Sequence, residues 1–309
     1  MASSEKDATS DEPFHFWRRM IAGGLSGAAA KTCSAPLDRV KILYQVRSKH
    51  YPSRRGVLRT LASVVQLEKP GALFKGNMAQ LLRIVPYSSI TFVTFERVKM
   101  VLGDSPAARF ASGSVAGVTA TLVTYPLDLV RARLAASVHV SGQALPLAGR
   151  IRSTALDVLR RDGLRGFYNG GVPTLFGIVP YAGTSFLVFG MIKQRFGPDS
   201  HSMLPSFVPP NVIYGGFAGA VAQTVTYPID VVRRRMQLHG MAAASEFLDA
   251  KADTRRYPSA WRIFTKILRK EGIFAFYRGL SLNYYRVIPS VGVSFATHEF
   301  LKDKLGIGA

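Results

Sequence analysis

Three short segments of the chain carry an acid and a base at a fixed spacing after a proline. The acid and base pairs are Asp38 with Lys41, Asp128 with Arg131, and Asp230 with Arg233. Proline kinks a helix, and residues three apart share one helix face. One such segment would indicate only an ion pair within a surface helix. Three matched copies predict instead that the charges pair between helices in a shared mechanism.

A second set of polar positions differs between the three copies. Five residues before the first proline stand Lys31, Thr121 and Gln223, and three before a later proline stand Arg83, Gly177 and Arg286. The arginine fork binds two phosphate oxygens at once. Three cations beside a glycine-lined notch predict a ligand with a multiply charged anionic end and a flat end. Snorkelling or paired cations are the alternative interpretation.

The segments recur with a period near one hundred residues, which is typical of three copies of one folded unit. Each copy also contains an aromatic segment that ends in a glycine, at Gly76, Gly170 or Gly279. The domain boundaries predicted from the repeat are a flexible N-terminus over 1–13 and repeats over 14–102, 107–196 and 208–305. The copies differ mainly in loop length.

The charge balance predicts an anionic partner. The 309 residues include 40 Lys and Arg but only 19 Asp and Glu, which gives a net charge of +21. Nucleic acid is disfavoured, since the basic residues are spread over all repeats and no nucleic-acid-binding motif occurs. Anionic lipids and small anionic molecules suit the same charge. No nucleophile elbow, P-loop or metal-ligand cluster is present, so we expect neither an enzyme nor a bound cofactor or metal.

Uncharged runs over 110–127, 166–192 and 200–229 are long enough to cross a bilayer. Because repeats share a structure, we expect six transmembrane helices, with interrupting charges turned to a water-filled interior. They are predicted over Phe16–Val46, Met78–Leu102, Ala108–Val138, Val172–Phe196, Asn211–Leu238 and Ser281–Lys304. Amphipathic surface helices are predicted over Arg55–Leu67, Ile151–Arg161 and Trp261–Lys270. The expected fold is an all-α membrane protein of three parallel two-helix repeats with pseudo-threefold symmetry.

The tripled P-x-[DE]-x-x-[KR] motif with its downstream aromatic-basic-glycine segment resembles the mitochondrial carrier family, over 14–304. The segments 35–46 and 232–237 are most similar to the mitochondrial coenzyme A carriers. They are less similar to the ADP/ATP carrier, whose third repeat reads RRRMMM where this chain reads RRRMQL. The resemblance implies a transporter with two gates around a central binding site.

The resemblance implies a matrix gate made of inter-helix ion pairs. The expected pairs are Asp38 with Arg131, Asp128 with Arg233 and Asp230 with Lys41. Gln45 and Gln237 would brace this gate, whereas the second repeat has Ala135 at the brace position.

A cytoplasmic gate is implied at the opposite end. Its expected members are Glu96, Lys99, Lys193, Glu299 and Lys302. The middle copy has Gly190 where an acid is expected, so three lysines share two carboxylates. We expect this gate to close less firmly than the matrix gate.

The resemblance also implies roles for the residues between the gates. Gly177 and Ile178 would lie against an adenine ring, with Tyr181 as a stacking or polar neighbour and Thr226 as a hydroxyl contact. Packing is the alternative role for Tyr181. The phosphate-binding cations would be Lys31, Arg83 and Arg286.

The expected function is exchange of coenzyme A or a related adenine nucleotide, such as adenosine 3′,5′-bisphosphate or ADP, by antiport across the mitochondrial inner membrane. A multi-pass monomer is expected, with cardiolipin as a candidate lipid partner at helix N-termini. An ATP/ADP or thiamine pyrophosphate carrier is the alternative within transport. A basic lipid-binding scaffold is the alternative outside it. No residue distinguishes coenzyme A from dephospho-coenzyme A at this level.

Overall fold

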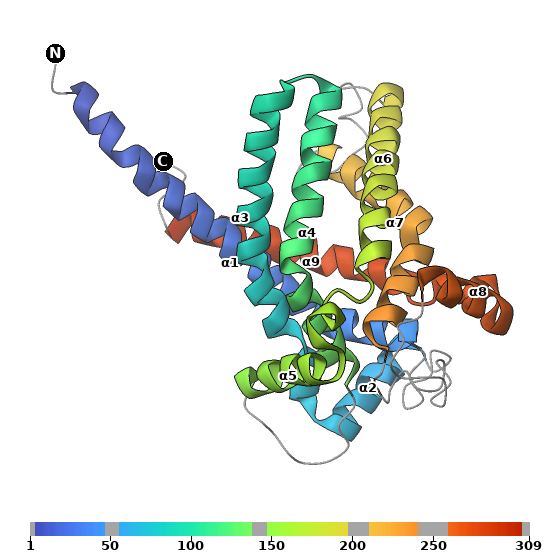
Figure 1. Ribbon diagram of the computed structural model, residues 1–309. Coiled ribbons are helices and arrows are strands. Elements are labelled where there is room, and N and C mark those ends of the chain that lie inside the picture. The colour runs from blue at the N-terminus through green and yellow to red at the C-terminus, as the bar shows by residue number, and fades with distance from the viewer. Residues whose placement is uncertain are drawn as a thin grey trace.

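The computed structural model describes residues 4–46, 56–137, 147–196, 210–239, 241 and 259–304, and these residues form nine α-helices, two short 310 helices and no strand. The long helices are α1 (Ser4–Val46), α3 (Asn77–Leu102), α4 (Pro106–Ala136), α6 (Gly171–Phe196), α7 (Pro210–Gln237) and α9 (Leu280–Lys304). They agree with the six predicted helices to within two residues, except that α1 begins well before Phe16. Figure 1 shows α3, α4 and α6 running side by side.

Shorter elements connect the two long helices of each repeat. They are α2 (Val57–Glu68), η2 (Pro70–Phe74), α5 (Leu147–Gly166), α8 (Ala260–Glu271) and η5 (Ile273–Tyr277). In Figure 1, α2 and α5 lie at the lower end of the bundle. The predicted surface helices Ile151–Arg161 and Trp261–Lys270 lie within α5 and α8. The predicted helix Arg55–Leu67 matches α2 from Val57 on, and Arg55 lies outside the described residues.

The long helices pack mainly across repeat boundaries. The most extensive contacts join α3 to α4, α6 to α7, and α9 back to α1. Each repeat therefore holds its neighbour, and the third closes onto the first, as pseudo-threefold symmetry requires.

Two of the described helices, α4 and α6, are long and apolar enough by length and composition to cross a membrane. The third predicted uncharged run, 200–229, begins outside the described residues. The apolar stretch of α6 is not buried by the protein. Phe176, Phe186 and Leu187 are among its exposed side chains, so α6 turns an apolar face outward.

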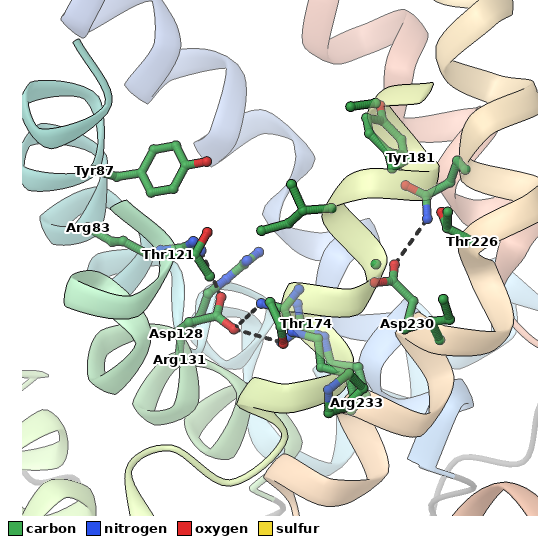
Figure 2. Close-up of a pocket in the computed structure, with 17 residues that line it drawn as sticks. Arg83, Tyr87, Thr121, Asp128, Arg131, Thr174, Tyr181, Thr226, Asp230 and Arg233 are labelled. Atoms are coloured by element: carbon green, nitrogen blue, oxygen red, sulfur yellow. Dashed lines mark hydrogen bonds and ion pairs between the residues drawn. The ribbon is translucent and has the colours of Figure 1, made fainter. Parts of the chain in front are cut away.

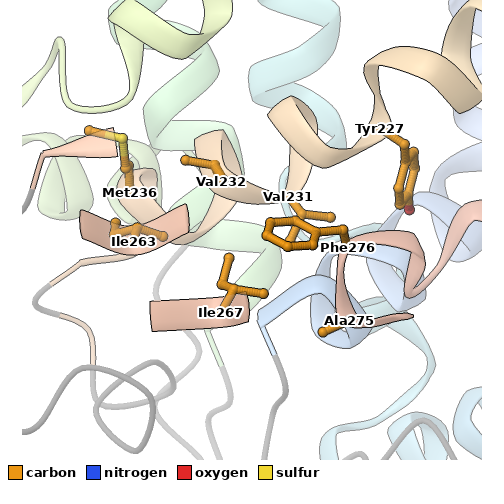
Figure 3. Close-up of a cluster of buried hydrophobic side chains, with 8 residues drawn as sticks. All are labelled: Tyr227, Val231, Val232, Met236, Ile263, Ile267, Ala275 and Phe276. Atoms are coloured by element: carbon orange, nitrogen blue, oxygen red, sulfur yellow. The ribbon is translucent and has the colours of Figure 1, made fainter. Parts of the chain in front are cut away.

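The surface helix α8 is held by an apolar cluster against α7 (Figure 3). Ile263 and Ile267 are buried one turn apart on α8, because residues at i and i+4 share a helix face. They pack with Val231 and Val232 of α7 and with Phe276 of η5. Basic residues of α8 lie on its other faces, beside the exposed side chains of Trp261 and Leu268.

Three buried arginines join the ends of α1, α4 and α7 in a cycle. Arg39 donates from Nε to the carbonyl of Ala135 at 3.2 Å, Arg133 to that of Gln237 at 3.1 Å, and Arg235 to that of Gln45 at 3.1 Å. These carbonyls lie at helix C-termini, which lack partners within the helix. Every arginine thus ties its own repeat to the next.

The same arginines bind acids at the ends of the surface helices. Arg39 pairs with Glu68 and Arg133 with Asp162. Arg235 pairs with Glu271, which Arg278 also contacts. The second and third arginines are equivalent in the repeat, but Leu43 stands at that position in the first. Arg39, one helical turn earlier, takes over the contact there.

Glycine is required where the chain passes from the aromatic segment into the second helix of each repeat. Gly170 has a φ of +84°, a conformation that other residues rarely adopt. A Cβ atom there would lie 3.0 Å from both the Arg233 carbonyl oxygen and the Tyr125 hydroxyl. The close approach of α6 to the ends of α4 and α7 depends on this glycine.

The Glu271→Gln variant should be strongly destabilised, because it leaves Arg235 buried without its carboxylate. Removing one partner of a buried ion pair costs about 3–5 kcal/mol, and the Glu271 side chain is 1% exposed. The measurement is the midpoint of thermal unfolding in detergent.

Asp104→Asn is the matched control, since Asp104 pairs with Arg109 at a side-chain exposure of 57%. Its unfolding midpoint should stay near that of the unmodified protein. Equal shifts for the two variants would contradict the anchoring role of Glu271.

Candidate substrate-binding site and gate

The structure brings each of the three expected matrix-gate pairs together. Arg131 donates to Asp38 at 2.9 Å and Arg233 donates to Asp128 at 2.6 Å. Lys41 lies 3.8 Å from Asp230. The pairs join α1 to α4, α4 to α7 and α7 to α1, so they close the space between these helices.

Each gate aspartate also binds a residue from the predicted substrate site or its repeat equivalent. Arg83 donates to Asp128 at 2.8 Å and Arg286 donates to Asp38 at 2.7 Å. Gly177, equivalent to both arginines, has no side chain to offer Asp230. Gln223 of α7 bonds Asp230 at 3.0 Å instead. Each of the three carboxylates therefore contacts one base of the gate and one polar side chain of the cavity above it.

The predicted braces differ in what they bind. Gln237 donates to Asp128 at 2.8 Å and to the Tyr125 hydroxyl at 3.2 Å. Gln45 donates only to the Tyr227 hydroxyl, at 3.2 Å, among the described residues. Its side-chain oxygen has no partner there.

The tyrosines that these glutamines bind, Tyr125 and Tyr227, immediately precede the first prolines of their repeats. The first repeat has Ala35 at that position, and the second repeat has Ala135 at the brace position. The boundary between α1 and α4 therefore lacks both members of the tyrosine and glutamine pair. The three gate interfaces are unequal in consequence.

A cavity of about 350 Å³ lies above the gate and contains most of the predicted substrate residues (Figure 2). Arg83 stands on one wall, and Tyr181 and Thr226 stand on the opposite wall. Gly177 and Ile178 also line it. The gap left by Gly177 is bordered by Ile229, whose Cγ2 would lie 3.4 Å from a Cβ atom there. Ile178 and Ile229 make this part of the wall apolar.

A second cavity of about 170 Å³ adjoins the first and holds the two remaining predicted cations, Lys31 and Arg286. Ile42 is the one apolar side chain in its lining. The two cavities share Gln223 and Arg234 and three members of the gate. The predicted site is thus split into two compartments, which its residue pattern does not indicate.

Arg234 lines both cavities and is absent from the sequence-predicted site. It donates to the side-chain oxygen of Gln237 at 2.7 Å and lies 3.6 Å from Asp128. Its repeat equivalents are Ile42 and Ala132. The asymmetry that singled out Lys31 would also have found this cation, but its position between two other arginines concealed it.

The predicted cytoplasmic gate is not assembled in this conformation. No ion pair joins Glu96 or Glu299 to a lysine within the described ranges, and Lys99 instead lies 3.2 Å from Asp104. Hydrogen bonds from Arg109 and Lys99 hold the pKa of Asp104 below its usual value. The three pairs of the predicted matrix gate are thus formed in this conformation, whereas Glu96 and Glu299 pair with no lysine among the described residues.

The family model described as mitochondrial carrier protein matches three consecutive stretches, residues 12–106, 102–200 and 205–308. The chain belongs to the mitochondrial carrier family. Members of this family are transporters, so the chain is a transporter and not an enzyme. The three matches coincide with the three repeats of the fold.

Relatives within the mitochondrial carrier family align over nearly the whole chain. Human solute carrier family 25 member 16 is 41% identical over 94% of this chain and 88% of its own. Arabidopsis thaliana mitochondrial carrier protein CoAc1 is 36% identical over 94% and 90%. The mitochondrial adenine nucleotide transporter ADNT1 of the same plant is 34% identical over 94% and 87%.

The Gln237→Ala variant should lower the stability of the substrate-free protein by about 1.5–3 kcal/mol, the range for a hydrogen bond to a charged group. The loss arises because Asp128 keeps its arginines but loses the amide donor. Thermal unfolding without ligand measures it.

Gln45→Ala is the matched control, because it removes an equally buried amide that binds a tyrosine and no carboxylate. A smaller shift is expected. If Gln45→Ala destabilises the protein as much as Gln237→Ala, the bond to Asp128 is not what distinguishes the two braces.

Proposed function

We propose that this carrier exchanges coenzyme A or a related adenine nucleotide, such as adenosine 3′,5′-bisphosphate or ADP, across the mitochondrial inner membrane by alternating access. All six long helices would cross the membrane. The charges that interrupt them would face the water-filled interior. A monomer is sufficient, since one chain supplies the complete ring of helices.

The observation that carries the proposal is the unbalanced positive charge of the cavities. The three gate aspartates are balanced by the three bases of the gate. Four further cations line the cavities in excess of these carboxylates, namely Lys31, Arg83, Arg234 and Arg286. Coenzyme A carries roughly four negative charges, since a phosphate monoester contributes nearly two and its diphosphate contributes about two more.

The glycine-lined notch supports an adenine-bearing substrate in particular. Gly177 lines the cavity without a side chain, Ile178 and Ile229 offer apolar surface, and Thr226 offers a hydroxyl. Small-molecule sites combine apolar surface with a few placed polar groups in this manner. A ribose with phosphates attached would then reach toward Arg83.

Substrate binding would also loosen the matrix gate. Arg83 and Arg286 each bind one gate aspartate, at 2.8 and 2.7 Å. A phosphate group that engages these arginines competes with the aspartates for them. The gate would thereby lose contacts only when an anion is present.

Two other substrate classes stay open to test. ADNT1, named as an adenine nucleotide transporter, is among the relatives, which favours ATP and ADP as the second candidate. Thiamine pyrophosphate has a diphosphate and flat rings and would satisfy the same charges. A lipid-binding scaffold would show no stabilisation by any of these substrates, and cardiolipin binding is compatible with every case.

Coenzyme A should raise the thermal unfolding midpoint of the purified carrier, because a ligand that binds only the folded state stabilises it. Arg83→Ala should abolish this shift by removing a phosphate-binding cation. Arg97→Ala, an exposed arginine of the same helix, is the control and should retain it.

Dephospho-coenzyme A, adenosine 3′,5′-bisphosphate, ATP, ADP and thiamine pyrophosphate complete the ligand panel. A shift with ATP and ADP alone would move the assignment to an ATP/ADP carrier. A shift with thiamine pyrophosphate alone would move the assignment to a thiamine pyrophosphate carrier. No shift with any nucleotide would overturn the proposed substrate class.

A further inference from the structure

We infer that the smaller cavity is a separate phosphate subsite, which receives the terminal 3′-phosphate of coenzyme A or adenosine 3′,5′-bisphosphate while the adenosine occupies the larger cavity. This inference rests on the proposed function, and it names the residues that would bind the 3′-phosphate. The residues that belong to this subsite and not to the larger cavity are Lys31, Gln80 and Arg286, together with Asp38, Lys41 and Ile42.

The charge of the two cavities is distributed unequally. The smaller one is lined by two carboxylates, Asp38 and Asp230, and by six cations, Lys31, Lys41, Arg131, Arg233, Arg234 and Arg286. The larger one has four cations for the same number of carboxylates. The smaller cavity therefore concentrates most of the positive charge in about half the volume, which suits a compact group of high charge.

Lys31 is the cation best placed to bind such a group. It forms no ion pair with any described residue, whereas Arg83 and Arg286 are each bound to a gate aspartate. Lys31 lies on the same face of α1 as Asp38, two helical turns earlier. Its ammonium is consequently available to an anion without breaking an existing pair.

Arg286 and Gln80 supply further donors. Arg286 binds Asp38 through Nη1, and the rest of its guanidinium fork contacts no acceptor in the described part of the chain. Gln80 lines the same cavity, and its amide nitrogen donates no hydrogen bond within the described part of the chain. A phosphate oxygen can accept a hydrogen bond from this amide nitrogen.

The shape of the substrate decides which phosphate enters. The 5′-diphosphate of coenzyme A continues into the pantetheine arm, which needs space beyond the phosphates. The 3′-phosphate ends the molecule on its side of the ribose. Only a terminal group fits a compartment of about 170 Å³ that is bounded by the closed gate.

The test compares ligands that differ by the 3′-phosphate alone. Dissociation constants of coenzyme A and dephospho-coenzyme A are measured by calorimetry on the detergent-purified full chain, for the unmodified carrier and for Lys31→Met. The variant should weaken coenzyme A by roughly tenfold or more and leave dephospho-coenzyme A nearly unchanged. Adenosine 3′,5′-bisphosphate against AMP should show the same difference.

Lys31→Arg should keep the preference for the 3′-phosphate, because it keeps the positive charge. Gln80→Leu provides an independent variant and should reduce the same preference. Arg83→Ala should weaken both ligands alike, since it lines the larger cavity. The ratio of ATP to ADP affinity should not respond to Lys31→Met.

Distinct outcomes overturn the subsite and the proposed function. Equal weakening of coenzyme A and dephospho-coenzyme A by Lys31→Met, with binding otherwise intact, overturns the subsite alone. A change in the ATP to ADP ratio without a change in the coenzyme A pair also overturns it. Failure of the unmodified carrier to bind any adenine nucleotide overturns both.

Discussion

The structure depends on three carboxylates placed where three helices converge. Asp128 is 1% exposed, and a charge at such a site is costly unless cations and hydrogen bonds surround it. Each carboxylate accordingly receives a base from the next repeat, and the cycle of pairs forces α1, α4 and α7 together. The proline kinks, the repeat symmetry and the glycine at the start of each following helix all serve this convergence.

The same constraint links the gate to the binding site. A carboxylate with two oxygens can accept bonds from below and from above, and Asp38 and Asp128 each do so with arginines of the gate and of the cavity. Arg83 and Arg286 of the cavity thus have carboxylate partners within the protein. An anionic substrate offers those arginines an alternative partner, so binding energy can be transferred to the gate without any covalent step.

The repeat predicted the six long helices, because equivalent positions must share a structure, and it predicted that the tripled charges pair between helices. The resemblance to mitochondrial carriers implied which acid pairs with which base. It could not show that Lys31 and Arg286 lie in a different cavity from Arg83, since that depends on how neighbouring side chains fill space. Arg234 was missed because two neighbouring arginines masked its asymmetry. The predicted cytoplasmic gate has no ion pair between Glu96 or Glu299 and a lysine among the described residues, and a single sequence does not encode which of two gates is formed.

Counter-exchange in liposomes tests the central claim most directly. The purified carrier is reconstituted, the vesicles are loaded with coenzyme A, with ADP or with buffer alone, and uptake of labelled coenzyme A is followed. Alternating access by a substrate-opened gate predicts rapid uptake into vesicles loaded with an adenine nucleotide and little into empty ones. Equal uptake into loaded and empty vesicles, or none into either, would contradict the account.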